Sequence, residues 1–148
     1  MSLNDFAYFQ VSLKTILRKE DSILLLITPD GYYDFPGGRI DKSEINLNFN
    51  DVLARELREE LGNDLKFKTD NVAFVSKRFY DKNNTNYHIL ATFFEAQWLE
   101  GNITLSNEHT KSRWIKPHSI LINPEKFISK DEYIQYKYYC DSNYSKTT

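Results

Sequence analysis

Apolar residues gather in short segments along the chain, and their spacing predicts the first elements. Residues 6–17 (FAYFQVSLKTIL) are rich in β-branched and aromatic side chains, which favours a strand. Residues 22–28 (SILLLIT) form a nearly continuous apolar run, which indicates a second strand that is buried on both faces. A Pro-Asp-Gly turn follows at 29–31, and residues 32–35 predict a short strand that ends at the break Pro36-Gly37-Gly38.

A polar loop through about Asn48 precedes an amphipathic helix. Asn50 is the expected N-cap of this helix, and Gly62 is its expected C-terminal stop. Leucines recur on one side at i, i+4 and i+8, and this stripe is expected to face the core: Leu53, Leu57 and Leu61.

The second half of the chain continues the mixture of strands and helices. Residues 72–80 and 87–98 predict a β-hairpin that is joined by the polar turn DKNNTN. Residues 111–115 predict a short strand, and residues 130–139 predict a helix. No repeat or linker divides the sequence, so the pattern predicts one mixed α/β domain over residues 1–148.

Composition and charge narrow the class of protein. A chain of 148 residues that is 41% hydrophobic can bury a core, and its net charge of −2 does not favour nucleic acid as a partner. The longest apolar run, 23–27, has five residues, whereas a membrane helix needs about 20. The first ten residues lack the features of a signal peptide. The single cysteine, Cys140, excludes an internal disulfide, so we expect a cytoplasmic protein without a membrane partner.

The predicted C-terminal helix carries tyrosines at i, i+3 and i+6, which are Tyr133, Tyr136 and Tyr139. We expect these rings to cover the sheet within the monomer. A homodimer contact is the alternative, because the sequence does not define the oligomeric state.

Three carboxylates crowd the central helix, within the segment LARELREELG at residues 53–62. Glu56 lies three residues before Glu59 and four before Glu60, and like charges at these spacings repel by about 0.2–0.5 kcal/mol per pair. All three glutamates lie at the edge of the face that carries the leucines. Arg55 precedes Glu59 by four residues and can pair with it. Such a cluster suits Mg²⁺ or Mn²⁺, which prefer oxygen ligands. A solvated, salt-bridged helix face is the alternative for this helix alone.

The residues upstream favour the cation site. Gly37 and Gly38 leave the backbone bare for close approach, and Glu44 follows Gly38 by six positions. Together with the helix they closely resemble the signature box of the Nudix hydrolases, the MutT-like family. That box is a Gly, five residues, a Glu, seven residues, Arg-Glu, an aliphatic, any residue, Glu-Glu, any residue, Gly and an aliphatic. The matching positions are Gly38, Glu44, Arg55, Glu56, Glu59, Glu60 and Gly62.

Two positions depart from the family box. Ten residues instead of seven separate Glu44 from Arg55, and Asn63 occupies the final aliphatic position. If the family spacing is counted back from Arg55, Leu47 falls at the Glu position and Asp41 at the Gly position, and neither residue fits the box. A three-residue insertion within 45–54 accounts for the spacing, because loops absorb extra length at little cost. This longer loop leaves open whether Glu44 still reaches Arg55.

The resemblance covers residues 35–62 and implies the fold and the reaction. It implies a Nudix fold, an α/β/α sandwich around a mixed β-sheet, in a single hydrolase domain. It also implies a pyrophosphohydrolase that uses Mg²⁺, or Mn²⁺, and cleaves a nucleoside diphosphate linked to another moiety by attack of water at phosphorus. Nucleoside triphosphates, nucleotide sugars and dinucleoside polyphosphates all remain as small-molecule substrates. The alternative is a non-catalytic Nudix-fold module that binds a nucleotide or regulates, while RNA decapping would favour a basic surface stripe.

The resemblance also assigns roles by position. The general base is the weakest of these assignments, because it is not always in the box in this family. The implied catalytic positions are Glu56, as ligand and candidate base, with Arg55 and Glu44 to orient the cluster. The implied metal ligands are Glu59, Glu60, Glu56 and the carbonyl of Gly38.

Other candidates lie outside the box. Residues 106–114 (SNEHTKSRW) resemble a late pattern of the family, so Glu108 or His109 would approach the metal site as base or ligand, with an exposed polar loop as the alternative. Tyr80 lies seventeen positions after Asn63, the last residue of the box. Family members that act on dinucleoside polyphosphates tend to carry Tyr at this distance from the box.

Two arginines are candidates for contacts with substrate phosphates. Arg39 follows the Gly-Gly pair, and Arg78 lies in the predicted hairpin. A solvated position is the alternative for both. None of these residues identifies the nucleobase or the leaving group.

Overall fold

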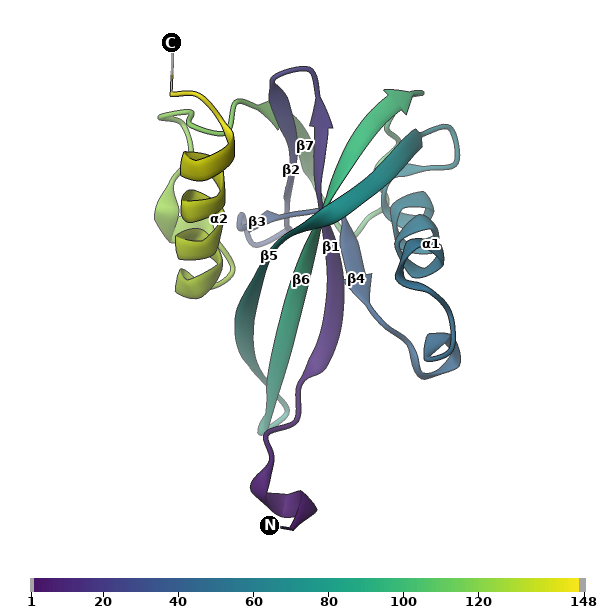
Figure 1. The fold of residues 1–148 in the computed structure, drawn as a ribbon, viewed down its shortest axis with the longest axis vertical. Helices are drawn as coiled ribbons and strands as arrows, with labels where there is room; N and C mark the ends of the chain where they lie inside the picture. The colour runs from purple at the N-terminus through teal and green to yellow at the C-terminus, as the bar shows by residue number, and fades with distance from the viewer. Residues whose placement is uncertain (1, 147–148) are drawn as a thin grey trace.

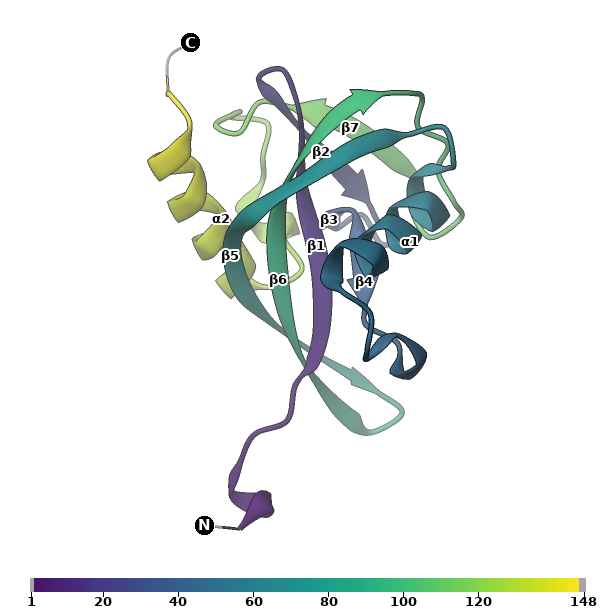
Figure 2. The ribbon, with the colours of Figure 1, turned by 45° about the vertical axis from the view of Figure 1, so that its right-hand side comes forward.

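The computed structural model describes residues 2–146, which form a central sheet between two helices (Figures 1 and 2). The strands are β1 (Gln10–Lys19), β2 (Ser22–Ile27), β3 (Tyr33–Asp34), β4 (Gly37–Arg39), β5 (Lys66–Lys82), β6 (Thr85–Glu100) and β7 (Lys111–Ile115). The helices are α1 (Phe49–Leu61) and α2 (Lys130–Asn143), and short 3₁₀ turns span Leu3–Asp5, Lys42–Glu44 and Pro124–Lys126.

The sheet has seven strands in a mixed arrangement. Its main order is β3-β2-β1-β6-β5, while β4 pairs with β1 and β7 pairs with β2. The pairing of β1 with β6 is parallel, and the other pairings are antiparallel. In Figure 1, α1 and α2 lie on opposite sides of the sheet. The predicted α/β/α sandwich with a mixed sheet is therefore confirmed.

Hydrophobic clusters fill both sides of the sheet. Because side chains alternate along a strand, Leu13 and Leu17 of β1 pack on the α1 side, whereas Ile16 packs on the α2 side. The predicted leucine stripe of α1 is fully buried in the cluster between α1 and the sheet. Tyr136 and Tyr139 of α2 are buried in the cluster between α2 and the sheet. These two tyrosines therefore cover the sheet within the monomer, as expected.

The Gly-Gly segment forms a strand, where the sequence pattern predicted a break. In β4, Gly38 lies opposite Leu13 of β1. Gly37 has φ +137°, and a Cβ added there would lie 2.0 Å from the carbonyl oxygen of Leu13. Backbone pairing stabilises this short strand, and no side-chain alternation could have indicated it.

We expect Gly37→Ala to lower the free energy of unfolding by at least about 2 kcal/mol, because it combines a backbone clash with an unfavourable φ. Gly31→Ala is the matched control, since Gly31 also has positive φ (+86°) but no neighbouring atom lies within 4 Å of an added Cβ. Its expected cost is about 1 kcal/mol. Urea denaturation measures both, and equal losses would contradict close approach as the cause.

The ends of two other elements differ from the predicted ones. Asn48, and not Asn50, caps α1, because its side chain accepts a hydrogen bond from the first turn. Asn50 lies inside the helix, and Gly62 ends it with φ +91° as expected. The β5–β6 hairpin is longer than predicted, and Asn83 and Asn84 both adopt positive φ in its two-residue turn. No helix within residues 2–146 is long and apolar enough to cross a membrane.

Candidate active site

A pocket of about 540 Å³ lies where β1, β3, β4, β5, α1 and the loop before β7 meet. The structure brings most of the predicted site residues together here: Gly38, Arg39, Glu56, Glu60, Tyr80, Glu108 and His109 line the pocket. Three other predicted residues, Glu44, Arg55 and Glu59, do not line it.

Arg55 holds the carboxylates of the helix together. Its Nε and Nη2 donate to the two carboxylate oxygens of Glu44, at 2.5 and 2.7 Å. Nη2 also donates to Glu56 at 2.7 Å, and Nη1 donates to Glu59 at 3.0 Å. The inserted loop therefore does not displace Glu44, whose pKa is lowered by the hydrogen bonds from Arg55 and from the backbone of Asp41.

Glu56 and Glu60 present their carboxylates to the pocket beside the glycines. A Cβ added at Gly38 would lie 2.4 Å from a carboxylate oxygen of Glu56, so glycine allows this contact. The backbone N–H of Gly37 donates to Glu60 at 3.3 Å. Burial raises the pKa of Glu56, and it raises the pKa of Glu60 to about 7. Burial therefore outweighs the nearby cations, Arg55 for Glu56 and Lys14 for Glu60.

The predicted metal ligands do not form a complete preformed cage. Within residues 2–146, no group of three or more His, Cys, Asp or Glu side chains is arranged to hold a metal ion. Glu59 is turned outward, with its side chain 60% exposed, and pairs with Arg55. The donors that face the pocket, Glu56 and Glu60, are nevertheless oxygen ligands whose raised pKa values a divalent cation would lower. Their chemistry fits Mg²⁺ or Mn²⁺.

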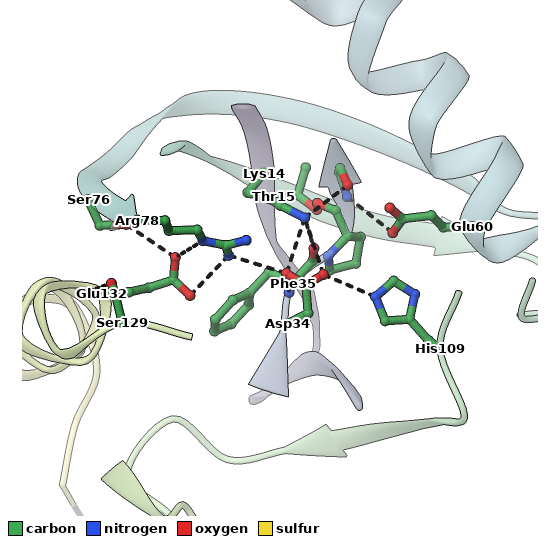
Figure 3. Close-up of polar contacts among 12 residues, drawn as sticks. Lys14, Thr15, Asp34, Phe35, Glu60, Ser76, Arg78, His109, Ser129 and Glu132 are labelled. Carbon is green, nitrogen blue, oxygen red and sulfur yellow. Dashed lines mark hydrogen bonds and ion pairs between the residues drawn. The ribbon is translucent and has the colours of Figure 1, made fainter. Parts of the chain in front are cut away.

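Asp34 is the centre of a buried charge network that the sequence did not indicate (Figure 3). It lies 3.1 Å from Nζ of Lys14, 3.2 Å from Nη2 of Arg78 and 3.0 Å from Nε2 of His109. Burial alone would raise the pKa of Asp34, but the two cations and the histidine hydrogen bond hold it well below its usual range. The sequence offered His109 and Arg78 as separate candidates, but not Asp34 or Lys14.

Lys14 also fixes the backbone beside the carboxylates. Its Nζ donates to the carbonyl oxygens of Phe35 and Gly37, at 3.2 and 3.0 Å. Because the N–H of Gly37 donates to Glu60, one chain of contacts joins Asp34 to the helix (Figure 3).

His109 and Glu108 differ in their surroundings. His109 is buried, so an exposed position is wrong for it, and its Nδ1 has no hydrogen-bond partner among the described residues. The bond to Asp34 contributes to a raised pKa of His109, although burial alone would lower it. Glu108 is exposed at the rim of the pocket, as the alternative interpretation expected.

Strands β4 and β5 contribute cationic and aromatic side chains to the pocket. Arg39 donates to the hydroxyl of Tyr80 and to Gln10, and its guanidinium lies 5.5 Å from the centre of the Tyr80 ring. Tyr80 stacks on Tyr87 with ring centres 4.9 Å apart. Arg78 is buried, so the solvated alternative for this residue is wrong. Carboxylates of α1 and cationic side chains of β4 and β5 therefore line the same pocket, an arrangement that can bind a cation together with an anion.

Comparisons with known proteins agree with the motif. The sequence profile of the NUDIX domain matches residues 9–136. The chain is 29% identical over 115 residues to the low-salt glycan biosynthesis protein Agl8 of Haloferax volcanii, covering 72% of this chain and 70% of that protein.

Solved structures show the same fold. One is the MutT protein from Methanosarcina mazei Go1, with TM-score 0.71 and 19% identity, covering 93% of this chain and 96% of that one. Another is an ADP-ribose pyrophosphatase from Streptococcus suis 89-1591, with TM-score 0.65 and 22% identity, covering 93% and 94%.

Proposed function

This chain belongs to the NUDIX domain family, and from that premise we propose that it is a divalent-cation-dependent pyrophosphohydrolase. Its substrate is a nucleoside diphosphate linked to another moiety, and the bond that breaks is a phosphoric anhydride attacked by water. The observation that carries this proposal is the pair of carboxylates, half-buried Glu56 and buried Glu60, that share one pocket with Arg39 and Arg78.

Glu56 and Glu60 would hold the cation, with Glu59 and the carbonyl of Gly38 as further donors. Mg²⁺ or Mn²⁺, when bound, neutralises phosphate oxygens and lowers the pKa of a water molecule. Arg55 contacts the carboxylate of Glu56 and orients it. This requires Arg55 to share that carboxylate with the cation.

The remaining pocket residues act on the substrate and the water. Glu56 is the proposed proton acceptor for the attacking water. Arg39 and Tyr80 bind the substrate, because they join a cation and an aromatic face on one wall. Asp34 orients the ring of His109 through Nε2, and the ring lines the pocket on the side of the loop before β7. Glu108 lies at the rim, where it can contact the leaving group.

The test is a substrate panel with Mg²⁺, Mn²⁺ or EDTA, with release of phosphate and pyrophosphate as the measurement. The panel holds nucleoside triphosphates, nucleotide sugars and dinucleoside polyphosphates, and it includes ADP-ribose because one structural relative is named an ADP-ribose pyrophosphatase. We expect at least one substrate to be hydrolysed and EDTA to reduce its rate by about 10³-fold or more.

Addition of excess Mg²⁺ to the EDTA-treated enzyme is the control and should restore the rate. Nucleotide binding without turnover of any substrate would contradict the proposal. That result would favour the alternative of a non-catalytic nucleotide-binding module.

A further inference from the structure

Arg78 of β5 lines the pocket, and two buried carboxylates, Asp34 and Glu132, bond its guanidinium (Figure 3). Its Nε and Nη2 donate to the two carboxylate oxygens of Glu132, at 2.7 and 3.0 Å. Nη2 also donates to Asp34 at 3.2 Å. Among the described residues, no hydrogen bond of Arg78 uses Nη1. One edge of the guanidinium is therefore fixed, and Nη1 keeps two N–H groups for another partner.

Glu132 belongs to α2, outside the pocket. It is fully buried, and it is not one of the residues that line the pocket. The hydroxyl of Ser76 donates to it at 3.2 Å, and its backbone N–H donates to the hydroxyl of the helix cap, Ser129, at 3.0 Å. Among these contacts, only the one with Arg78 leads to the pocket.

The first turn of α2 is hydrogen-bonded to the backbone of β5 at Lys77, next to Arg78. The hydroxyl of Ser129 donates to the carbonyl oxygen of Lys77 at 2.7 Å. The N–H of Lys77 donates to Asp131 at 2.8 Å. These bonds fix the helix against the strand, so the carboxylate of Glu132 has a defined position behind the arginine.

A purely structural role does not account well for this arrangement. Buried ion pairs contribute little net stability compared with apolar side chains of similar volume. Lys14 and Arg78 are balanced by Asp34 and Glu132, so the buried network already has equal numbers of formal positive and negative charges without His109. A planar guanidinium that is fixed on one edge and unbonded at Nη1 is suited to bind phosphate oxygens.

We propose that Nη1 of Arg78 binds an anionic phosphate group of the substrate, and that Glu132 is a positioning residue that acts on the pocket through Arg78. This inference deepens the proposed function and rests on it for the identity of the substrate. It assigns the phosphate contact to a side chain on the sheet, opposite the carboxylates of α1.

The test combines titration calorimetry with inorganic pyrophosphate in EDTA and steady-state kinetics on the best substrate. Glu132→Gln keeps the size of the side chain but removes its charge and one acceptor for Arg78. We expect it to weaken pyrophosphate binding about tenfold and to raise KM by a similar factor, with kcat within about twofold. Asp141→Asn is the matched control in the same helix, since Asp141 is exposed and pairs with Lys137 away from the pocket; both values should stay unchanged.

Wild-type pyrophosphate affinity in Glu132→Gln, or a loss confined to kcat, would overturn the proposal. Arg78→Lys keeps a cation but lacks the planar fork, and it should lose affinity equally; it decides the matter if Glu132→Gln is too unstable to assay. The two proposals can fail separately. Pyrophosphate binding that depends on Glu132 in a wild-type protein without hydrolysis would overturn only the hydrolase function, whereas hydrolysis with unchanged binding in both variants would overturn only this inference.

Discussion

Replacing Glu60 with glutamine is expected to lower kcat/KM by about 10³-fold or more, equivalent to about 4 kcal/mol of transition-state stabilisation. Glu60 is the carboxylate of α1 that is buried in the pocket, with 3% of its surface exposed, and the N–H of Gly37 fixes one of its oxygens. Glutamine keeps the shape and one carbonyl oxygen but cannot supply the negative charge that a divalent cation requires. Steady-state kinetics with Mg²⁺ on the best substrate measures the effect.

Glu59→Gln is the informative comparison, because it makes the same change one residue earlier on the same helix. The side chain of Glu59 is 60% exposed and pairs with Arg55, so we expect a clearly smaller loss. Equal losses would contradict the ranking by burial. They would support the family pattern, in which both glutamates are ligands.

Unfolding measurements on the metal-free protein separate this loss from misfolding. The pKa of Glu60 is raised to about 7 by burial, from 4.5. The folded state therefore keeps a proton that the unfolded chain loses near pH 4.5, and the free energy of unfolding falls as pH rises from about 4.5 to 7. The decrease is at most about 3 kcal/mol. Glu60→Gln should remove it and be at least as stable as the wild type at pH 7.

The helix that carries this residue could be predicted because its information is local. Leu53, Leu57 and Leu61 define the buried stripe by their spacing, and the same spacing places Glu56 and Glu60 one turn apart. The spacing could not show that Glu60 is buried and Glu59 exposed, since that depends on where β4 lies against the helix. Local turn chemistry likewise predicted the β5–β6 hairpin.

The charge network in the pocket wall could not be predicted in this way. The partners of Asp34 lie 20, 44 and 75 positions away in the sequence, at Lys14, Arg78 and His109. Glu132 lies 54 positions from Arg78. No periodicity relates residues at such separations. The pairing of strands, the packing of α2 on the sheet and the course of the loop before β7 together bring them into contact. The sequence offered His109 and Arg78 as separate candidates, but nothing in it indicated that Asp34 joins them.

Asp34→Asn is expected to lower the free energy of unfolding by about 3–5 kcal/mol. Asparagine has nearly the same volume, but it leaves Lys14 and Arg78 buried with only Glu132 as a counter-charge. It also replaces one carboxylate oxygen, which accepts hydrogen bonds from the cations, with an NH₂ group that can only donate. Urea denaturation at pH 7 measures the loss.

Glu100→Gln provides the control, because Glu100 forms a short but exposed ion pair with Lys66, at 2.5 Å with both side chains more than 60% exposed. Its expected cost is below about 1 kcal/mol. The pKa of Asp34 is lowered in the folded state, so its contribution is present above its unfolded pKa and is lost as pH falls toward the folded one. The gap between wild type and Asp34→Asn should therefore narrow in acid. A gap that stays constant from pH 7 to pH 3 would contradict a charge effect and indicate that asparagine disturbs packing instead.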